Sequence, residues 1–465
     1  MAKPKHPLRI PLAATGLLAL SGCASLTADH GFAEVAETAQ ARTGYEARWT
    51  PDEGARAAVR AEVERLLAPP LDMDSAVRVA LLNNPGLQAS YAELGIAEAD
   101  LVQAGRLRNP GFSYAQLSAE GEGGVSIERS VTFDFLGLLT MPVASKIEKK
   151  RFAQTKLRVA DDIVRVATDA RRAFVSAVAA QETARYLANA QEAVAASREL
   201  AERMARAGNI SQLDLLRERA FYGEVSAELA QARQIALAER ENLVRILGLA
   251  KQEPMKLSER LPELPKQVDE IRDVEELALT RRFDVAAGKR EIESLASSLG
   301  LTKATRFVNV LEVGYLSNTN ADGPNETGYE ITLELPLFDW GSARVAKAEA
   351  IYMQAFNRVT ELAIHARSEV RETYAAYKSG YDLARYYRDE VVPVRRKIAE
   401  ENVLRYNGML IGPFDLLIDA RDQIATEIRY VEAVRDFWLA EAALAQAVGG
   451  RAGVLNNTPA KAATE

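Results

Sequence analysis

Reactive side chains are scarce in this chain of 465 residues, which has one cysteine, Cys23, and three histidines, His6, His30 and His365. A single cysteine excludes an internal disulfide. His6 lies in a predicted leader and His30 in the linker after it, and no second His or Cys stands at ligand spacing from His365. A transition-metal site or a Cys–His nucleophile is therefore hard to assemble. We predict a protein that is not an enzyme, with no catalytic residue, metal ligand or cofactor.

A basic surface and a glycine-rich phosphate loop are also missing. The formal net charge is −7, whereas binding to a phosphate backbone requires clustered Lys and Arg. The chain contains no loop of the kind that cradles nucleotide phosphates. We therefore expect no nucleic-acid partner and no nucleotide hydrolysis.

The N-terminus has the layout of a signal peptide. Three positive charges within residues 3–9 precede a short apolar stretch over residues 10–20, which is too short for a spanning helix. The stretch ends in Leu20-Ser21-Gly22-Cys23, which resembles a bacterial lipobox, and this resemblance makes Cys23 the lipidated first residue of the mature protein. The alternative is that Cys23 is a small buried residue. Ala24 differs from the Asp of an inner-membrane retention signal, which favours the outer membrane.

Long apolar runs are absent after residue 22, so the mature chain is either soluble or crosses a membrane as β-strands, whose sequence signal is weak. Apolar and polar residues alternate over 125–135 and 328–338, and less regularly near 308–316. We predict two pairs of strands, at about 110–119 and 125–135 and at about 307–317 and 328–338. Ten-residue strands span a bilayer when tilted. The alternative is a half-buried soluble sheet.

Proline and glycine are absent between Pro142 and Arg206. A helix of that length extends on the order of 95 Å. Apolar residues recur at alternating spacings of three and four, which is the seam of helices that coil on one another. The members of this seam are Ile163, Val166, Ala170, Ala173, Ala177, Ala180, Ala184 and Leu187.

The sequence contains an internal duplication. Gly208 is followed by Leu213-Asp214-Leu215-Leu216, and Gly412 by Phe414-Asp415-Leu416-Leu417. A strand over 131–135 recurs over 331–338. Prolines near residues 254–265 separate the halves. We therefore expect two homologous repeats.

The predicted organisation follows from these boundaries. It comprises a signal peptide (1–22), a lipidated extension (23–70) with a short helix over 51–68, a first repeat (71–250), a Pro-containing linker (251–270), a second repeat (271–449) and a disordered tail (450–465). The long helices are predicted at about 141–206 and 210–248 in the first repeat, and at about 341–406 and 413–448 in the second.

Several motifs in this order resemble the outer membrane efflux protein family, whose best-known member is TolC. They are Leu81-Leu82-Asn83-Asn84-Pro85, Arg108-Asn109-Pro110, Leu335-Pro336-Leu337-Phe338-Asp339-Trp340-Gly341 and the two glycine-to-Asp-Leu-Leu turns. The resemblance covers about 71–449. It implies an α+β membrane protein in which three protomers share a twelve-stranded β-barrel, four strands from each, continued by a periplasmic α-helical barrel. Pro336, Phe338, Trp340 and Gly341 would form the junction between strand and helix.

The resemblance also implies a constricted periplasmic tip at the two turns. Asp415 and Tyr406 match the constricting residues of the second repeat, and Asp214 matches the first. Gly208, Gly408 and Gly412 would be the turn glycines. The second constricting aspartate of the family falls at Ile418, with Asp419 one residue late, and its arginine partner falls at Ile411. One acidic ring is thus expected rather than two. The alternative is that Asp415 only caps the following helix.

The function implied by the resemblance is that of a passive outer-membrane duct in a tripartite efflux pump that exports small molecules or metal ions. Its partners would be two further copies of the chain, a periplasmic adaptor, an inner-membrane transporter of the RND or a similar class, and outer-membrane lipid. One alternative is a duct for type I protein secretion. Another, of a different class, is a coiled-coil structural lipoprotein without a channel. The segment over 406–412 weakly resembles relatives linked to copper and other heavy metals.

Overall fold

The computed structural model describes residues 25–118, 124–249, 255–268, 270–320 and 323–451. The predicted signal peptide, Cys23 and most of the predicted tail lie outside these residues. The chain forms two compact units, each assembled from segments of both sequence halves. Unit 1 contains 92–158 and 284–361 with the segment before Ala33, and unit 2 contains 33–91, 159–283 and 362–451. The compact units therefore do not coincide with the two predicted repeats.

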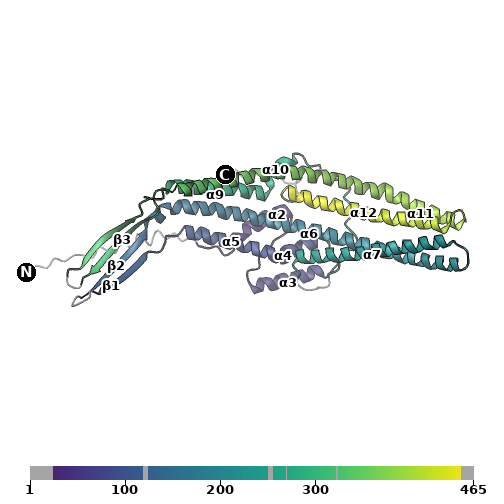
Figure 1. The fold of residues 1–465 in the computed structure, drawn as a ribbon, viewed down its shortest axis with the longest axis horizontal. Helices are drawn as coiled ribbons and strands as arrows, with labels where there is room; N and C mark the ends of the chain where they lie inside the picture. The colour runs from purple at the N-terminus through teal and green to yellow at the C-terminus, as the bar shows by residue number, and fades with distance from the viewer. Residues whose placement is uncertain (1–24, 119–123, 250–254, 269, 321–322, 452–465) are drawn as a thin grey trace, which may run out of the picture. The chain divides into compact units, whose positions relative to one another are not determined.

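The elements follow one another in the same order in each half, a helix, a strand pair and then long helices (Figure 1). The first half contains α4 (Met73–Asn83), α5 (Pro85–Ala104), β1 (Gly111–Ser118), β2 (Val125–Asp134), α6 (Phe135–Arg206) and α7 (Gln212–Leu247). The second contains α8 (Val274–Arg281), α9 (Phe283–Ala304), β3 (Leu311–Thr319), β4 (Glu326–Leu333), α10 (Ser342–Tyr386), a π-helix η1 (Tyr387–Val391), α11 (Val392–Asn407) and α12 (Pro413–Ala447). Two helices precede them, α2 (Phe32–Thr43) and α3 (Glu53–Leu67).

Unit 1 holds a single antiparallel sheet in the order β1-β2-β3-β4. Val131 lies opposite Tyr315, which in turn lies opposite Tyr329, and the two tyrosine rings meet edge to face at 5.9 Å. Large apolar side chains such as Phe112, Tyr329 and Ile331 are exposed. In the described part of the chain, β1 and β4 each pair with one neighbour only, so both edges of the sheet are open.

Two predicted boundaries in the strands were wrong. β4 ends at Leu333 instead of 338, because Pro336 has no N–H to donate to the ladder; the last backbone bond across this pair runs from the Glu334 N–H to the Val310 carbonyl, at 3.3 Å. β3 starts at Leu311 instead of 307.

The long helices also differ from the expectation. α6 begins at Phe135 and carries Pro142 inside it, so the proline does not mark its start. The helix predicted over 341–406 is interrupted by η1, just before Pro393 at the start of α11. The ring of Pro393 sterically displaces the carbonyl of residue 389, and one wide turn accommodates it. α2 was not predicted.

The core of unit 2 lies between its long helices. The seam residues from Ile163 to Ala177 are buried, and a second cluster on α10 and α12 is centred on Phe437, Tyr377 and Tyr381. The linker packs against that cluster, since the carbonyls of Lys266 and Pro262 accept hydrogen bonds from Tyr381 and Trp438. Within the described residues, no helix combines the length and the apolar content that crossing a membrane requires.

Candidate channel tip, its supports and related proteins

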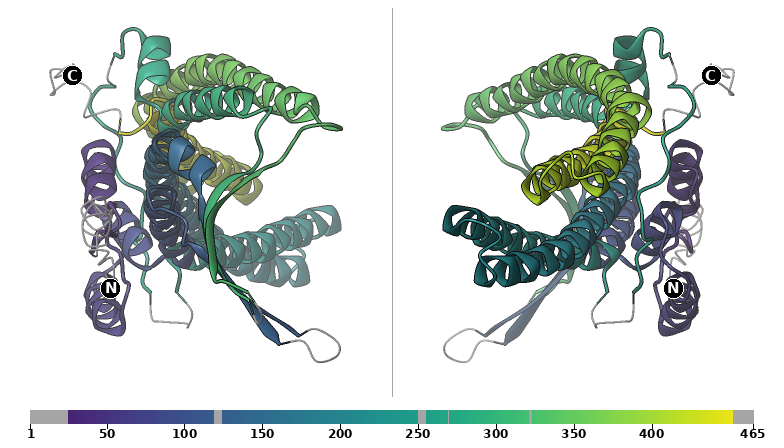
Figure 2. Two further views of the ribbon diagram at one scale, coloured as in Figure 1. Left: turned by 90° about the vertical axis from the view of Figure 1, so that its left-hand side faces the viewer. Right: turned by 90° about the vertical axis from the view of Figure 1, so that its right-hand side faces the viewer.

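The two glycine turns of unit 2 both place an aspartate in the first turn of the following helix, but they are built differently. The first joins α6 to α7 through Gly208, whose φ of +75° suits glycine; Ser211 caps α7, and its hydroxyl bonds both the N–H and the carboxylate of Asp214. In the second, Gly412 precedes α12 and its N–H donates to Asp415 at 3.0 Å. Both aspartates thus occupy the third position of a helix and stabilise its N-terminus. Figure 2 (right) views the two hairpins end-on.

The three acidic residues predicted for the tip have different surroundings. Asp415 is exposed and Asp214 half-buried, whereas Asp419 is only 8% exposed. The hydrogen bond from the Gly412 N–H shows that Asp415 caps α12, as the alternative in the sequence analysis expected; the exposed carboxylate remains available for other contacts. Tyr406 lies near the end of α11 and is partly exposed.

The turn at 408–412 carries exposed apolar side chains. Met409 has a φ of +59° and is 93% exposed, an unfavourable conformation for a residue with a side chain. Leu410 beside it is also exposed. A strained, exposed apolar residue on a turn is typical of a contact surface.

Cross-hairpin contacts in unit 2 were not predicted. Arg421 on α12 pairs with Glu224 on α7 at 3.3 Å and lies over the ring of Phe221. Ile424 packs on the buried clusters of the α6–α7 hairpin. These contacts join residues about 200 positions apart in the sequence, so patterns among neighbouring residues do not predict them.

Glu218 on α7 is a buried acid that sequence analysis missed. It is 2% exposed, its Oε1 has no hydrogen-bond partner, and burial raises its pKa although Ser197 bonds the carboxylate. The sequence does contain a signal for its burial, because Glu218 stands at a heptad position in the same series as the buried Leu215, Val225 and Leu229.

The junction after β4 is built around Gly341, which has a φ of +71°. A Cβ on this residue would lie 2.5 Å from the Arg306 carbonyl oxygen. Its N–H bonds Asp339 at 2.8 Å. Trp340 meets the ring of Phe307 edge to face, while Phe338 is fully exposed.

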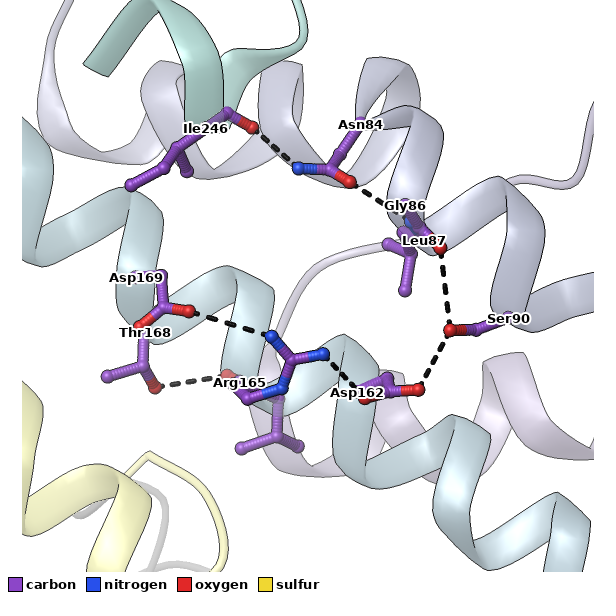
Figure 3. A network of polar contacts seen from close by, with 10 residues as sticks. Asn84, Gly86, Leu87, Ser90, Asp162, Arg165, Thr168, Asp169 and Ile246 are labelled. Carbon is purple, nitrogen blue, oxygen red and sulfur yellow. Dashed lines mark hydrogen bonds and ion pairs between the residues drawn. The ribbon is translucent and has the colours of Figure 1, made fainter. Parts of the chain in front are cut away.

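The Asn83-Asn84-Pro85 motif connects the α4–α5 corner to the end of α7. The Asn83 amide donates to the carbonyls of Leu247 and Gly248, and the Asn84 amide donates to that of Ile246. The side-chain Oδ1 of Asn84 accepts from the Leu87 N–H (Figure 3).

A polar chain extends from this corner to α6. Ser90 donates to Asp162 at 2.8 Å, and Asp162 pairs with Arg165 at 2.6 Å (Figure 3). The corner thus fixes α4, α5, α6 and α7 relative to one another within unit 2.

This chain is similar to known proteins in sequence and in fold. No protein-family model matches the chain. The chain is 22% identical over 278 residues to the cobalt-zinc-cadmium resistance protein CzcC of Cupriavidus metallidurans. That match covers 59% of this chain, and it spans 65% of the length of the relative.

Solved structures resemble the chain over most of its length. The outer-membrane channel OprN has a TM-score of 0.69 at 18% identity and covers 89% of this chain and 95% of its own. The CmeC outer membrane channel of Campylobacter jejuni has a TM-score of 0.68 at 15% identity, with coverages of 81% and 85%. CusC has a TM-score of 0.66 at 15% identity, with coverages of 83% and 94%. The resemblance predicted from the sequence motifs is thereby confirmed: this chain has the fold of the TolC family of outer-membrane efflux channels.

Proposed function

We propose that the chain is the outer-membrane component of a tripartite efflux pump, a passive duct made of three copies. The observation that carries this proposal is the sheet with two open edges. Four strands with exposed apolar side chains are unstable as a free sheet. Because β1 and β4 run in opposite directions, β4 of one copy can pair with β1 of the next in the same antiparallel pattern. Three copies would close a twelve-stranded barrel.

The helices offer a second surface for association. On α7 an exposed series of apolar and small residues recurs at alternating spacings of three and four, namely Leu213, Leu216, Ala220, Gly223, Ala227 and Ala230. A Cβ on Gly223 would meet no atom within 4 Å. Such a stripe is the seam of a coiled-coil contact that lacks its partner helix within one chain. The neighbouring copy would supply that helix.

The remaining assignments follow from the same proposal. Cys23 would carry the lipid that anchors each copy in the outer membrane. The turns at Gly208 and Gly412 would form the periplasmic tip, which docks an adaptor, and the exposed Asp415 would form an acidic ring there. An acidic ring on a threefold axis favours cations. A passive duct needs no catalytic group, so an inner-membrane transporter would supply the energy.

Conductance tests the duct. Purified, lipidated protein in a planar bilayer is expected to show small cation-selective openings, and Asp415→Ala is expected to reduce the preference for cations. Because Asp415 also caps α12, Asp415→Asn is the matched variant, since it removes the charge and keeps a capping side chain. A well-folded, lipidated sample without conductance would favour the coiled-coil structural lipoprotein instead.

Association is tested on the α7 stripe. Gly223→Trp is expected to leave the secondary structure intact and to reduce the trimer fraction on size-exclusion chromatography with light scattering. Glu228→Trp, on an exposed position of α7 outside the stripe, is the control. A trimer that tolerates Gly223→Trp as well as Glu228→Trp contradicts the assigned contact.

Heavy-metal ions are the cargo that the similarity to CzcC favours, and secreted protein is the alternative. A deletion strain is expected to lose tolerance to cobalt, zinc or cadmium and to regain it with the plasmid-borne gene. Unchanged tolerance together with a lost secreted protein would favour type I secretion.

A further inference from the structure

We propose that unit 2 contains a binding site for a small inorganic anion, for which chloride is the probe, between α2, α6 and the residues after α12. The site is a cavity of about 30 Å³ lined by the side chains of Arg42, Arg171 and Arg451 together with Tyr45, Thr43 and Thr168. A cavity that holds one water requires about 10–15 Å³. A monatomic anion therefore fits, and a large organic anion does not.

The arginines bring more hydrogen-bond donors than the protein satisfies. Arg171 is 9% exposed and pairs through one Nη with Glu441 at 3.1 Å, but its Nε has no hydrogen-bond partner. Arg42 and Arg451 have no carboxylate partner among the described residues; each lies near an aromatic ring, that of Phe283 and that of Tyr45 respectively. A guanidinium has five N–H donors. Arg42 and Arg451 are half-buried, so part of their donors faces open space, whereas the buried Nε of Arg171 costs free energy because it has no acceptor.

A fourth arginine adds to the positive potential. Arg281 is adjacent to Arg42, and burial together with that neighbour lowers the pKa of Arg281 to about 10. Burial also lowers the pKa of Arg42. The Arg281 Nε, like that of Arg171, has no hydrogen-bond partner. An anion in this region would relieve repulsion between like charges.

Two nearby groups offset part of this charge without occupying the cavity. Glu441 faces Arg171, and Asp74 accepts a hydrogen bond from the Tyr45 hydroxyl. The C-termini of α2 and α12 also lie beside the arginines, which explains why arginine is favoured there. The Nε of Arg171 is itself too buried to face the cavity, so the terminal nitrogens of the arginines would hold the anion.

The site would join three separate parts of the chain. The Arg451 N–H donates to the Arg42 carbonyl at 2.9 Å, so the residues after α12 already lie against the end of α2. Gly450 permits this approach, because a Cβ there would lie 2.8 Å from the Arg42 oxygen. An anion held by Arg42, Arg171 and Arg451 would fix α2 and the C-terminal residues on α6.

Bromide is the first test, because it replaces chloride and scatters anomalously. Crystals of the full chain soaked in sodium bromide are expected to show an anomalous peak in this cavity. A peak that is absent while bromide occupies other surface sites, or electron density that only a water explains, overturns the proposal.

Solution measurements supply the second test. The chloride-35 NMR line is expected to broaden with the wild-type protein, and the excess broadening is expected to fall by at least half in Arg451→Gln. Arg233→Gln, which removes an exposed arginine of α7, should retain it. Arg171→Gln would leave Glu441 without its ion-pair partner and can unfold the protein. Arg451→Gln is therefore the decisive variant. Equal broadening in wild type and Arg451→Gln contradicts the proposal.

Hydrogen exchange supplies the third test. Replacing gluconate by chloride at constant ionic strength is expected to slow exchange several-fold in peptides covering 39–45 and 446–451, and to leave 212–247 unchanged. Unchanged exchange in both peptides argues against the site, whatever the outcome of the channel experiments.

Discussion

Removal of the Glu98 carboxylate is expected to release the segment that follows the predicted lipid anchor. Glu98 on α5 is 4% exposed. One carboxylate oxygen accepts from the N–H of Thr27 at 2.9 Å and from its hydroxyl at 2.8 Å, and the other lies 2.6 Å from the His30 Nδ1. The segment also turns through two left-handed residues, His30 and Gly31, so it needs these bonds to hold a strained turn.

The magnitude follows from the bonds. Three hydrogen bonds at about 1 kcal/mol each give about 3 kcal/mol of docking free energy for the segment. That corresponds to roughly a 100-fold change in the fraction of time it is detached. Glu98→Gln keeps an acceptor for Thr27 but loses the charge facing His30, so an intermediate loss of about 1 kcal/mol is expected.

Native-state hydrogen exchange of the amides of residues 27–32 measures this opening directly. In Glu98→Ala these amides are expected to exchange roughly 100-fold faster. Glu93→Ala, an exposed glutamate of the same helix, is the control. Protection that stays within twofold of wild type in Glu98→Ala would refute the reasoning, because the segment would then be held by packing alone.

The same bonds predict a pH dependence. Burial alone would raise the pKa of Glu98, but the bonds from Thr27 and His30 outweigh it and the pKa lies below its ordinary value of 4.5. A lowered pKa contributes stability that is complete above that value and is lost as pH falls through the folded-state pKa. Protection of residues 27–32 should therefore decrease below about pH 4.5 in the wild type and change much less in Glu98→Ala.

Three further outcomes are expected. Gly248→Ala and Gly208→Ala both place a Cβ at positive φ, but only at Gly248 would it lie 2.5 Å from a backbone oxygen, that of Asn83; chemical unfolding should show a loss of about 1 kcal/mol for Gly208→Ala and at least twice that for Gly248→Ala. Asn84→Ala should cost about 1–2 kcal/mol in the same assay, since it removes a cap and a bond to α7, and a loss as small as that of the exposed Asn357→Ala would contradict this. Burial raises the pKa of Glu218, so the contribution of this group to stability should decrease as pH rises above about 4.5; Glu218→Gln should therefore gain stability relative to wild type over that rise, and a difference between the two that does not change with pH would refute the assignment.

Local patterns predicted part of this fold well. Alternation located β1 and β2 within a few residues, and the repeated glycine turns located both hairpins, because turn and cap chemistry acts over four to six residues. The buried seam of α6 could be predicted because the alternating spacing of three and four between its apolar residues identifies the face of the helix that is buried. The position of Asp415 as a cap was also accessible.

Other features depend on contacts between distant residues. The pairing of Arg421 with Glu224 and that of Glu98 with Thr27 leave no periodic trace in the sequence. The cavity between Arg42, Arg171 and Arg451 has the same origin, since its three arginines lie on separate segments. The predicted helix over 341–406 ran through Pro393 without interruption. The wide turn at η1 was missed because the strain that a proline places on the preceding turn can be relieved by a local π-helical turn, and the helical pattern continues on both sides of it.

The central pairing of the sheet has a consequence for the order in which the protein folds. β1 and β2 form a local hairpin, as do β3 and β4, but Ile127 pairs with Thr319 and Asp134 with Glu312. Each hairpin can form as soon as its own two strands are available, while the β2–β3 ladder must wait for the 176 residues of 135–310 that separate β2 from β3, and long closures of this kind are slow. During that interval β2 presents an unpaired edge. The first half of the chain is therefore expected to need protection by a chaperone until β3 arrives, and a chain truncated before Leu311 should aggregate rather than accumulate as a folded half.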